Sequence, residues 1–177
     1  MNRTYDDTMF IDTFEHEYTW LNGFMRNVRR YGSRPAVIDP ETGTAWTYSK
    51  LNAEANRLAH GLIDAGIGKN DVVMSALKNC PEFCTSYIAP RKAGAILLAA
   101  NTSLATEEMA QLIDHNKPKA IIYSAVLKDV VAGALKISEC KCPLVIMADN
   151  LSGVEAPEGH VLYEDFIKDK SEDNPVI

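Results

Sequence analysis

The chain has 177 residues, of which 46% are hydrophobic and 24% charged, a composition typical of a globular domain with one sizeable core. Its formal net charge of -6 argues against a nucleic-acid-binding protein, which needs clustered cations. The longest uncharged apolar run, residues 93–100, is far shorter than the ~20 residues that span a bilayer, and the polar, acidic start of the chain is not a secretory signal.

Residues 1–33 form a predicted N-terminal arm that is polar with scattered aromatic residues and ends in a short helix over residues 18–31. Four arginines make this region locally basic: Arg26, Arg29, Arg30 and Arg34. A solvated helix face is the ordinary interpretation, and an anion or partner site is the alternative. In residues 35–48, two short β-rich runs flank Asp-Pro-Glu-Thr-Gly, whose proline and glycine favour the turn of a β-hairpin.

A long amphipathic helix should follow the hairpin. Ser49 stands where an N-cap belongs, and Gly66 stands where a glycine closes a helix. Between them, apolar residues recur with helical spacing on one face: Leu51, Ala55, Leu58, Ala59, Leu62 and Ile63.

From residue 71 onward, short apolar runs alternate with helical patterns. Buried strands are predicted at residues 71–77, 95–99, 119–123 and 144–147. Helices are predicted at residues 81–93, from Thr106 as N-cap to a point before Pro118, and at residues 125–138. A short edge strand at 161–163 and a brief helix at 164–168 complete the pattern. Strand and helix alternation at this spacing predicts βαβ crossovers.

The predicted fold class is therefore α/β, with a mostly parallel sheet, helices on both faces and an N-terminal β-hairpin. This subdomain should occupy residues 34–169, and the polar segment 170–177 is interpreted as a linker. The segment Gly66-Ile67-Gly68-Lys69-Asn70 is not a phosphate-binding P-loop, because it leads from a helix to a strand and lacks the required first glycine and final Ser or Thr.

The four cysteines indicate in which cellular compartment the protein is located, because disulfides persist in oxidising compartments. Cys80 and Cys84 would share one face of a helix, and Cys140 and Cys142 would point the same way on a strand. A four-thiolate zinc site and a disulfide are alternatives, but zinc ligands usually sit in tight loops, and disulfide scaffolds lack so much apolar patterning. Free thiols without a metal are predicted, with a cytoplasmic location.

An ordered series of short segments carries a family resemblance. The segments are Arg34-Pro35-Ala36-Val37-Ile38, Trp46-Thr47-Tyr48-Ser49-Lys50-Leu51, residues 65–73, Lys78-Asn79-Cys80-Pro81-Glu82-Phe83, Arg91-Lys92-Ala93-Gly94-Ala95, Asn101-Thr102-Ser103-Leu104 and Glu107-Glu108-Met109. In this order and with these gaps, the region 34–123 resembles the N-terminal portion of the adenylate-forming acyl-CoA synthetases, the AMP-dependent synthetase and ligase family.

The resemblance implies a ligase that makes an acyl-adenylate from a carboxylate and ATP and then transfers the acyl group to CoA. The family's Thr-Ser-Gly-Thr-Thr-Gly-like phosphate loop, its Tyr-Gly-x-Thr-Glu segment, its ribose-binding Asp and its catalytic Lys do not occur in the 177 residues. We therefore expect a truncated N-terminal part of a larger ligase fold, with no catalytic residue of its own. ATP, Mg and CoA would belong to the full-length parent.

The expected partner is the remainder of the ligase chain, and apolar surface left uncovered would favour self-association. A standalone non-catalytic binding module with the same fold is the first alternative, and an unrelated doubly wound nucleotide-binding domain is the second.

By the resemblance, Lys92 occupies a Lys/Arg-x-Gly position that lies near the CoA nucleotide in some family members, and Arg91 is beside it. A contact of these two residues with a CoA phosphate is one interpretation. The other is a solvent-facing cation that interacts with the dipole at the end of a helix.

Overall fold

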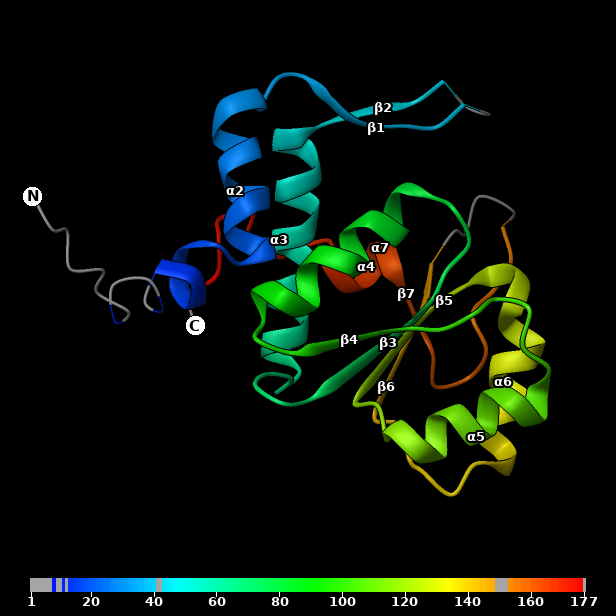
Figure 1. Ribbon diagram of the computed structural model, residues 1–177. Helices are drawn as coiled ribbons and strands as arrows, with labels where there is room; N and C mark the ends of the chain where they lie inside the picture. The colour runs from blue at the N-terminus through cyan, green and yellow to red at the C-terminus, as the bar shows by residue number, and fades with distance from the viewer. Residues whose placement is uncertain (1–7, 9–10, 12, 41–42, 149–152, 177) are drawn as a thin grey trace, which may run out of the picture.

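A five-stranded, fully parallel sheet forms the centre of the molecule (Figure 1). The computed structural model describes residues 8, 11, 13–40, 43–148 and 153–176. The strands are β3 (Val72–Ala76), β4 (Ile96–Ala99), β5 (Ala120–Ser124), β6 (Leu144–Ala148) and β7 (Val161–Leu162), in the order β4-β3-β5-β6-β7. All four strands predicted to be parallel lie in this one sheet, and the short edge strand is confirmed.

Helices cover both faces of the sheet, as predicted. One face carries α3 (Tyr48–Asp64), α4 (Pro81–Lys92) and the short α7 (Tyr163–Ile167). The other carries α5 (Thr106–Asn116) and α6 (Lys128–Ile137), which follows a short 3-10 turn, Ala125–Leu127. Helix α4 continues through Pro90 to Lys92 without interruption.

The side chains of the strands divide between two cores because successive residues point to opposite faces. In β5, Ile122 packs among residues of α3 and α4, whereas Ile121 and Tyr123 pack among residues of α5 and α6. Every residue of β5 is buried, which explains why the sequence shows continuous apolar runs rather than an alternating pattern.

A smaller third core joins the N-terminal part to the sheet domain. Helix α2 (Trp20–Tyr31) and the hairpin of β1 (Pro35–Ile38) and β2 (Ala45–Thr47) pack against α3 and α4 around Phe24 and Ile88. A single π-helical turn, Thr13–Glu17, precedes α2. The predicted hairpin is confirmed, although residues 41–42 of its turn lie outside the described residues.

Two predicted helix caps are wrong by one or two residues. The N-cap of α3 is Thr47 rather than Ser49, and its Oγ1 accepts a hydrogen bond from the Lys50 N–H at 3.1 Å. Thr106 is the first residue of α5 instead of its cap, because the Glu108 carboxylate reaches back to accept from the Ala105 N–H at 2.9 Å.

Gly66 closes α3 as predicted. It has a φ of 77°, and the N–H groups of Gly66 and Ile67 donate to the carbonyls of Ile63 and Leu62. This is the hydrogen-bond pattern of a Schellman motif, which favours glycine at the left-handed position.

No disulfide joins the four cysteines, and the predicted placement of one pair is wrong. Cys140 and Cys142 lie in the connection between α6 and β6 rather than on a strand. They pack on the α5–α6 side of the sheet, whereas Cys80 packs on the α3–α4 side, so the sheet separates the two pairs. Within the described ranges, no helix is long and apolar enough to cross a membrane.

Two glycines in helices should respond oppositely to alanine. A Cβ at Gly61 would lie 2.6 Å from Cε1 of Phe166, so Gly61→Ala should destabilise the fold by about 1–3 kcal/mol. A Cβ at Gly23 would meet only Arg26 Nη2 at 3.9 Å, so Gly23→Ala should stabilise it by up to about 1 kcal/mol. Denaturant unfolding of both variants measures these changes, and equal shifts in both would contradict the packing of α7 on α3.

Candidate functional site at the end of helix α4

Lys92 is buried at the C-terminal end of α4, with only 4% of its surface exposed. Its Nζ donates to Asn52 Oδ1 at 2.9 Å and to Asn174 Oδ1 at 2.7 Å, and it lies 3.4 Å from Met25 Sδ. Burial lowers the pKa of Lys92 to about 8. The interpretation of Lys92 as a solvent-facing cation is therefore wrong, because α2, α3 and the C-terminal segment cover it.

Arg91 points to different neighbours. Its guanidinium carbon lies 4.2 Å from the centre of the Tyr87 ring and 4.9 Å from that of Trp20, and it also donates a hydrogen bond to the Tyr87 carbonyl. These are cation–π distances. Lys92 is held by Met25, Asn52 and Asn174, whereas Arg91 lies against Tyr87 and Trp20, so the two cations have no contact partner in common. Their contact with a CoA phosphate stays a prediction.

The segment 170–174, which the sequence indicates is a linker, lies along α3 (Figure 1, red). Asn56 Nδ2 donates to the Glu172 carbonyl at 2.5 Å, and His60 Nε2 lies 3.0 Å from the Asp173 carbonyl. Lys170 and Glu172 also form ion pairs with side chains of α3. The segment thus runs from α7 to Lys92 with side-chain contacts along its length.

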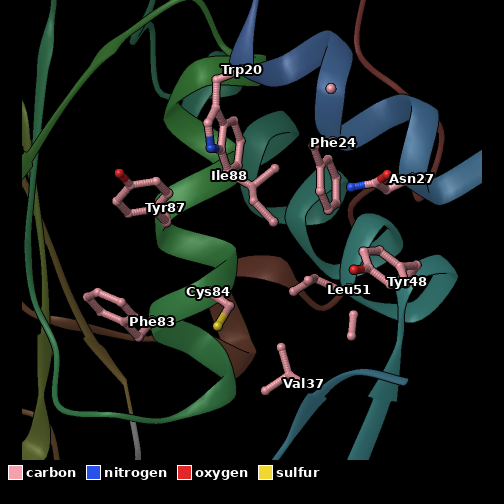
Figure 2. Close-up of a pocket in the computed structure, with 12 residues that line it drawn as sticks. Trp20, Phe24, Asn27, Val37, Tyr48, Leu51, Phe83, Cys84, Tyr87 and Ile88 are labelled. Atoms are coloured by element: carbon pink, nitrogen blue, oxygen red, sulfur yellow. The ribbon is translucent and has the colours of Figure 1, made fainter. Parts of the chain in front are cut away.

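A pocket of about 590 Å³ lies between α4, α2, α3 and β1 (Figure 2). Its lining residues are Trp20, Gly23, Phe24, Asn27, Ala36, Val37, Tyr48, Leu51, Phe83, Cys84, Tyr87 and Ile88. They come from α2, β1, α3 and α4, and most are apolar or aromatic, so the pocket suits an apolar ligand. The sequence did not predict this pocket, and its only signal was the cluster of aromatic residues in the N-terminal arm.

The one thiol in the pocket is not set up as a nucleophile. Burial raises the pKa of the Cys84 thiol, and the Glu82 carboxylate raises it further. A thiol with a raised pKa stays protonated at neutral pH, and the thiolate is the reactive form. Cys84 is therefore an uncharged, apolar part of the pocket lining.

A pair of polar side chains, Tyr123 and His160, lies near the carboxyl ends of the strands. Between β3 and β5 the strand order reverses: β3 is followed by β4 on one side, and β5 is followed by β6 on the other. Ligands commonly bind at such a point in open α/β sheets. Nearby, Tyr123 Oη lies 2.7 Å from His160 Nδ1. Burial raises the pKa of Tyr123 to about 12 and lowers that of His160, so both are neutral at pH 7. In the part of the chain that the structure describes, no three His, Cys, Asp or Glu side chains gather as metal ligands.

Comparisons with known proteins agree with one another. The family model described as "AMP-binding enzyme" matches residues 24–175. Among curated proteins, the chain is 37% identical over 94 residues to 4-coumarate–CoA ligase 3 of Oryza sativa subsp. japonica, which covers 53% of the chain and 17% of that protein. It is 28% identical over 162 residues to 4-coumarate–CoA ligase 1 of Arabidopsis thaliana, which covers 92% of the chain and 28% of that protein.

Solved structures show the same fold. A benzoate CoA ligase from Burkholderia xenovorans LB400 superposes with a TM-score of 0.72 at 24% identity, covering 85% of the chain and 28% of that structure. Coronafacic acid ligase from Pectobacterium brasiliense superposes with a TM-score of 0.75 at 20% identity, covering 85% of the chain and 29% of that structure. The chain thus spans less than a third of the length of each of these relatives.

Proposed function

The chain belongs to the AMP-binding enzyme family, and on that premise we propose that it is the amino-terminal part of an acyl-CoA ligase. Such an enzyme converts a carboxylate and ATP to an acyl-adenylate and then transfers the acyl group to CoA. The main support for this proposal is the family match over residues 24–175. The chain spans only a small part of the length of its CoA-ligase relatives. By itself the chain is catalytically incomplete.

Among the residues that the structure describes, neither the turn at residues 66–70 nor Lys92 fits a bound triphosphate. The glycine-containing turn at residues 66–70 joins α3 to β3, and its Gly68 N–H already donates to the Asp71 carboxylate at 3.0 Å. A carboxylate in that position repels phosphate. The ammonium group of Lys92 is enclosed by three neutral side chains. We therefore assign ATP and Mg to the remainder of the ligase, which is also the proposed partner of this chain.

The DNA downstream of the Ile177 codon tests this proposal. The expected result is an open frame that encodes a Gly-rich phosphate loop and the rest of a ligase. The longer product should then release pyrophosphate and form the acyl-adenylate when a carboxylate, ATP and Mg are present, and should release AMP and form acyl-CoA when CoA is added. A stop codon directly after Ile177 would contradict the proposal and leave a standalone module.

One observation favours that second candidate, a non-catalytic binding module: the pocket in Figure 2 needs no further chain to exist. An apolar fluorescent probe should then bind the wild-type chain saturably. Gly23→Leu should abolish binding, because Gly23 lines the pocket and has open space at its Cβ. Gln111→Leu, on the exposed surface of α5, adds the same side chain elsewhere and should bind normally. Equal binding by both variants rules out this pocket.

Self-association of the isolated chain belongs to the same proposal. Several large apolar side chains are exposed on the described surface, among them Ile38, Ile96, Val126 and Ile137. The remainder of a ligase would cover part of this surface, and a second copy of the chain is the substitute. A cytoplasmic location also stays a prediction.

A further inference from the structure

We propose that Lys92 is a positioning residue, whose buried ammonium group fixes the course of segment 170–174 and hence the direction in which the chain continues from it. The proposal rests on the proposed function insofar as the following part is the rest of a ligase. The anchoring of the segment itself is independent of any catalytic activity.

The ammonium group of Lys92 contacts three separate parts of the chain. An ammonium group has three N–H donors, and Nζ of Lys92 has three polar neighbours. They come from α2, from α3 and from the C-terminal segment, through Met25, Asn52 and Asn174. One side chain at the end of α4 thus joins three separate parts of the chain, and Asn174 at 2.7 Å is its shortest contact.

Of the contacts that segment 170–174 makes, those with buried side chains hold it in place better than those at the surface. The ion pairs Arg57–Glu172 and Asp64–Lys170 lie at the surface, where such pairs contribute little. The contacts from Asn56 and Lys92 come from buried side chains, which have fixed positions. Asn56 holds a backbone carbonyl, and Lys92 holds the side chain two residues later. Together they set both the position and the direction of the segment.

The free-energy cost of burying the ammonium group of Lys92 also favours a positioning role. Removing a cation from water is costly, and an apolar side chain of similar size often gives equal or greater stability at such a site. No carboxylate of the described residues pairs with Lys92 to offset this cost. What the ammonium group adds, and an apolar side chain does not, is a directional contact with Asn174. The contact therefore specifies where the segment lies more than it stabilises the fold.

Trypsin digestion of the 177-residue chain tests the anchoring. Cleavage after Lys170 releases residues 171–177 and needs that segment to leave α3. We expect Lys92→Met and Asn174→Ala each to speed this cleavage about tenfold, the ratio that one hydrogen bond to a charged group supplies. The double variant should be no faster than the singles, because both remove the same contact.

Two controls separate anchoring from loss of fold. Lys136→Met, an exposed lysine on α6, should leave cleavage after Lys170 unchanged. The denaturant midpoint of Lys92→Met at neutral pH should equal or exceed that of the wild type. Asn174→Ala changes an exposed residue that belongs to none of the three cores. Wild-type cleavage rates in both Lys92→Met and Asn174→Ala would overturn the proposal.

A kinetic measurement on the longer ligase separates positioning from a CoA phosphate contact. A positioning role predicts that Lys92→Met lowers kcat for adenylate formation and leaves KM for CoA unchanged, whereas a phosphate contact predicts a raised KM for CoA. A raised KM for CoA with normal cleavage after Lys170 would overturn the positioning role. If the wild-type longer product forms no adenylate, the proposed function fails, while the trypsin result still decides the anchoring.

Discussion

The 177-residue chain is expected to show no ATP–pyrophosphate exchange with any carboxylate. Phosphoryl chemistry needs backbone N–H groups and cations directed at the phosphates. In this chain the Gly68 N–H is occupied by a carboxylate, the ammonium group of Lys92 is enclosed, and the guanidinium group of Arg91 lies against two aromatic rings. Exchange of labelled pyrophosphate into ATP, with Mg and a panel of aliphatic and aromatic acids, measures this directly.

A contaminating ligase is the main source of error in such an assay. Leu58→Asp, purified in the same way, provides the control, because Leu58 is fully buried and a carboxylate there prevents folding. A contaminant gives the same exchange in both preparations. Exchange that is present in the wild-type preparation and absent from the Leu58→Asp preparation would mean that this chain forms adenylates, and the incomplete-enzyme proposal would fail.

The centre of the sheet could be predicted from sequence because its three inner strands are buried on both faces. β3, β5 and β6 have four or five fully buried residues each, so each is a short apolar run bounded by turn residues. The helices between them show the spacing of residues that cover a sheet on one side only. These are local patterns, and the topology follows from them by the right-handed crossover rule.

The environment of Lys92 could not be predicted in this way. Its three partners lie 67, 40 and 82 residues away in the sequence, and no local pattern reports them. A lysine at the end of a helix is usually solvated, so position alone gave the opposite expectation.

The segment 170–174 shows the same limit. Its composition is that of a linker, while its contacts are with side chains far away in the sequence, among them Asn56 and His60 of α3 and Lys92 of α4. Local sequence describes what a segment can do in isolation, and here long-range contacts decide where it lies.

The predicted N-caps of α3 and α5 were wrong because neighbouring residues decide which residue begins each helix. Thr47 and Ser49 both carry a hydroxyl group that can cap α3, and the end of β2 determines which of them has extended backbone. At α5 the N-cap residue is Ala105, which has no polar side chain to cap the first turn, and the helix start is marked by the Glu108 carboxylate, which accepts a hydrogen bond from the Ala105 N–H. Such one-residue choices depend on the neighbouring element rather than on propensity.

The free energy of unfolding of the wild type, relative to Lys92→Met, should rise by up to about 3 kcal/mol between about pH 8 and pH 10.5. The pKa of Lys92 falls from its ordinary 10.5 to about 8 in the folded chain. Between these values the unfolded chain binds a proton that the folded chain does not, so stability increases with pH. Below about pH 8 both states carry the charge, and the full cost of burying it is present.

Other groups titrate in the same range with the opposite sign. Burial raises the pKa of Cys142 to about 11 and that of Tyr123 to about 12, so these groups make the folded chain less stable as the solution becomes more alkaline. They are identical in the wild type and in Lys92→Met, and their effects cancel in the difference. Urea unfolding of both proteins across this pH range gives that difference. For Lys136→Met, the difference in unfolding free energy from the wild type should not change with pH. A flat difference for Lys92→Met as well would mean that the ammonium group of Lys92 is solvated in solution, and the contacts with Asn52 and Asn174 would then not be formed.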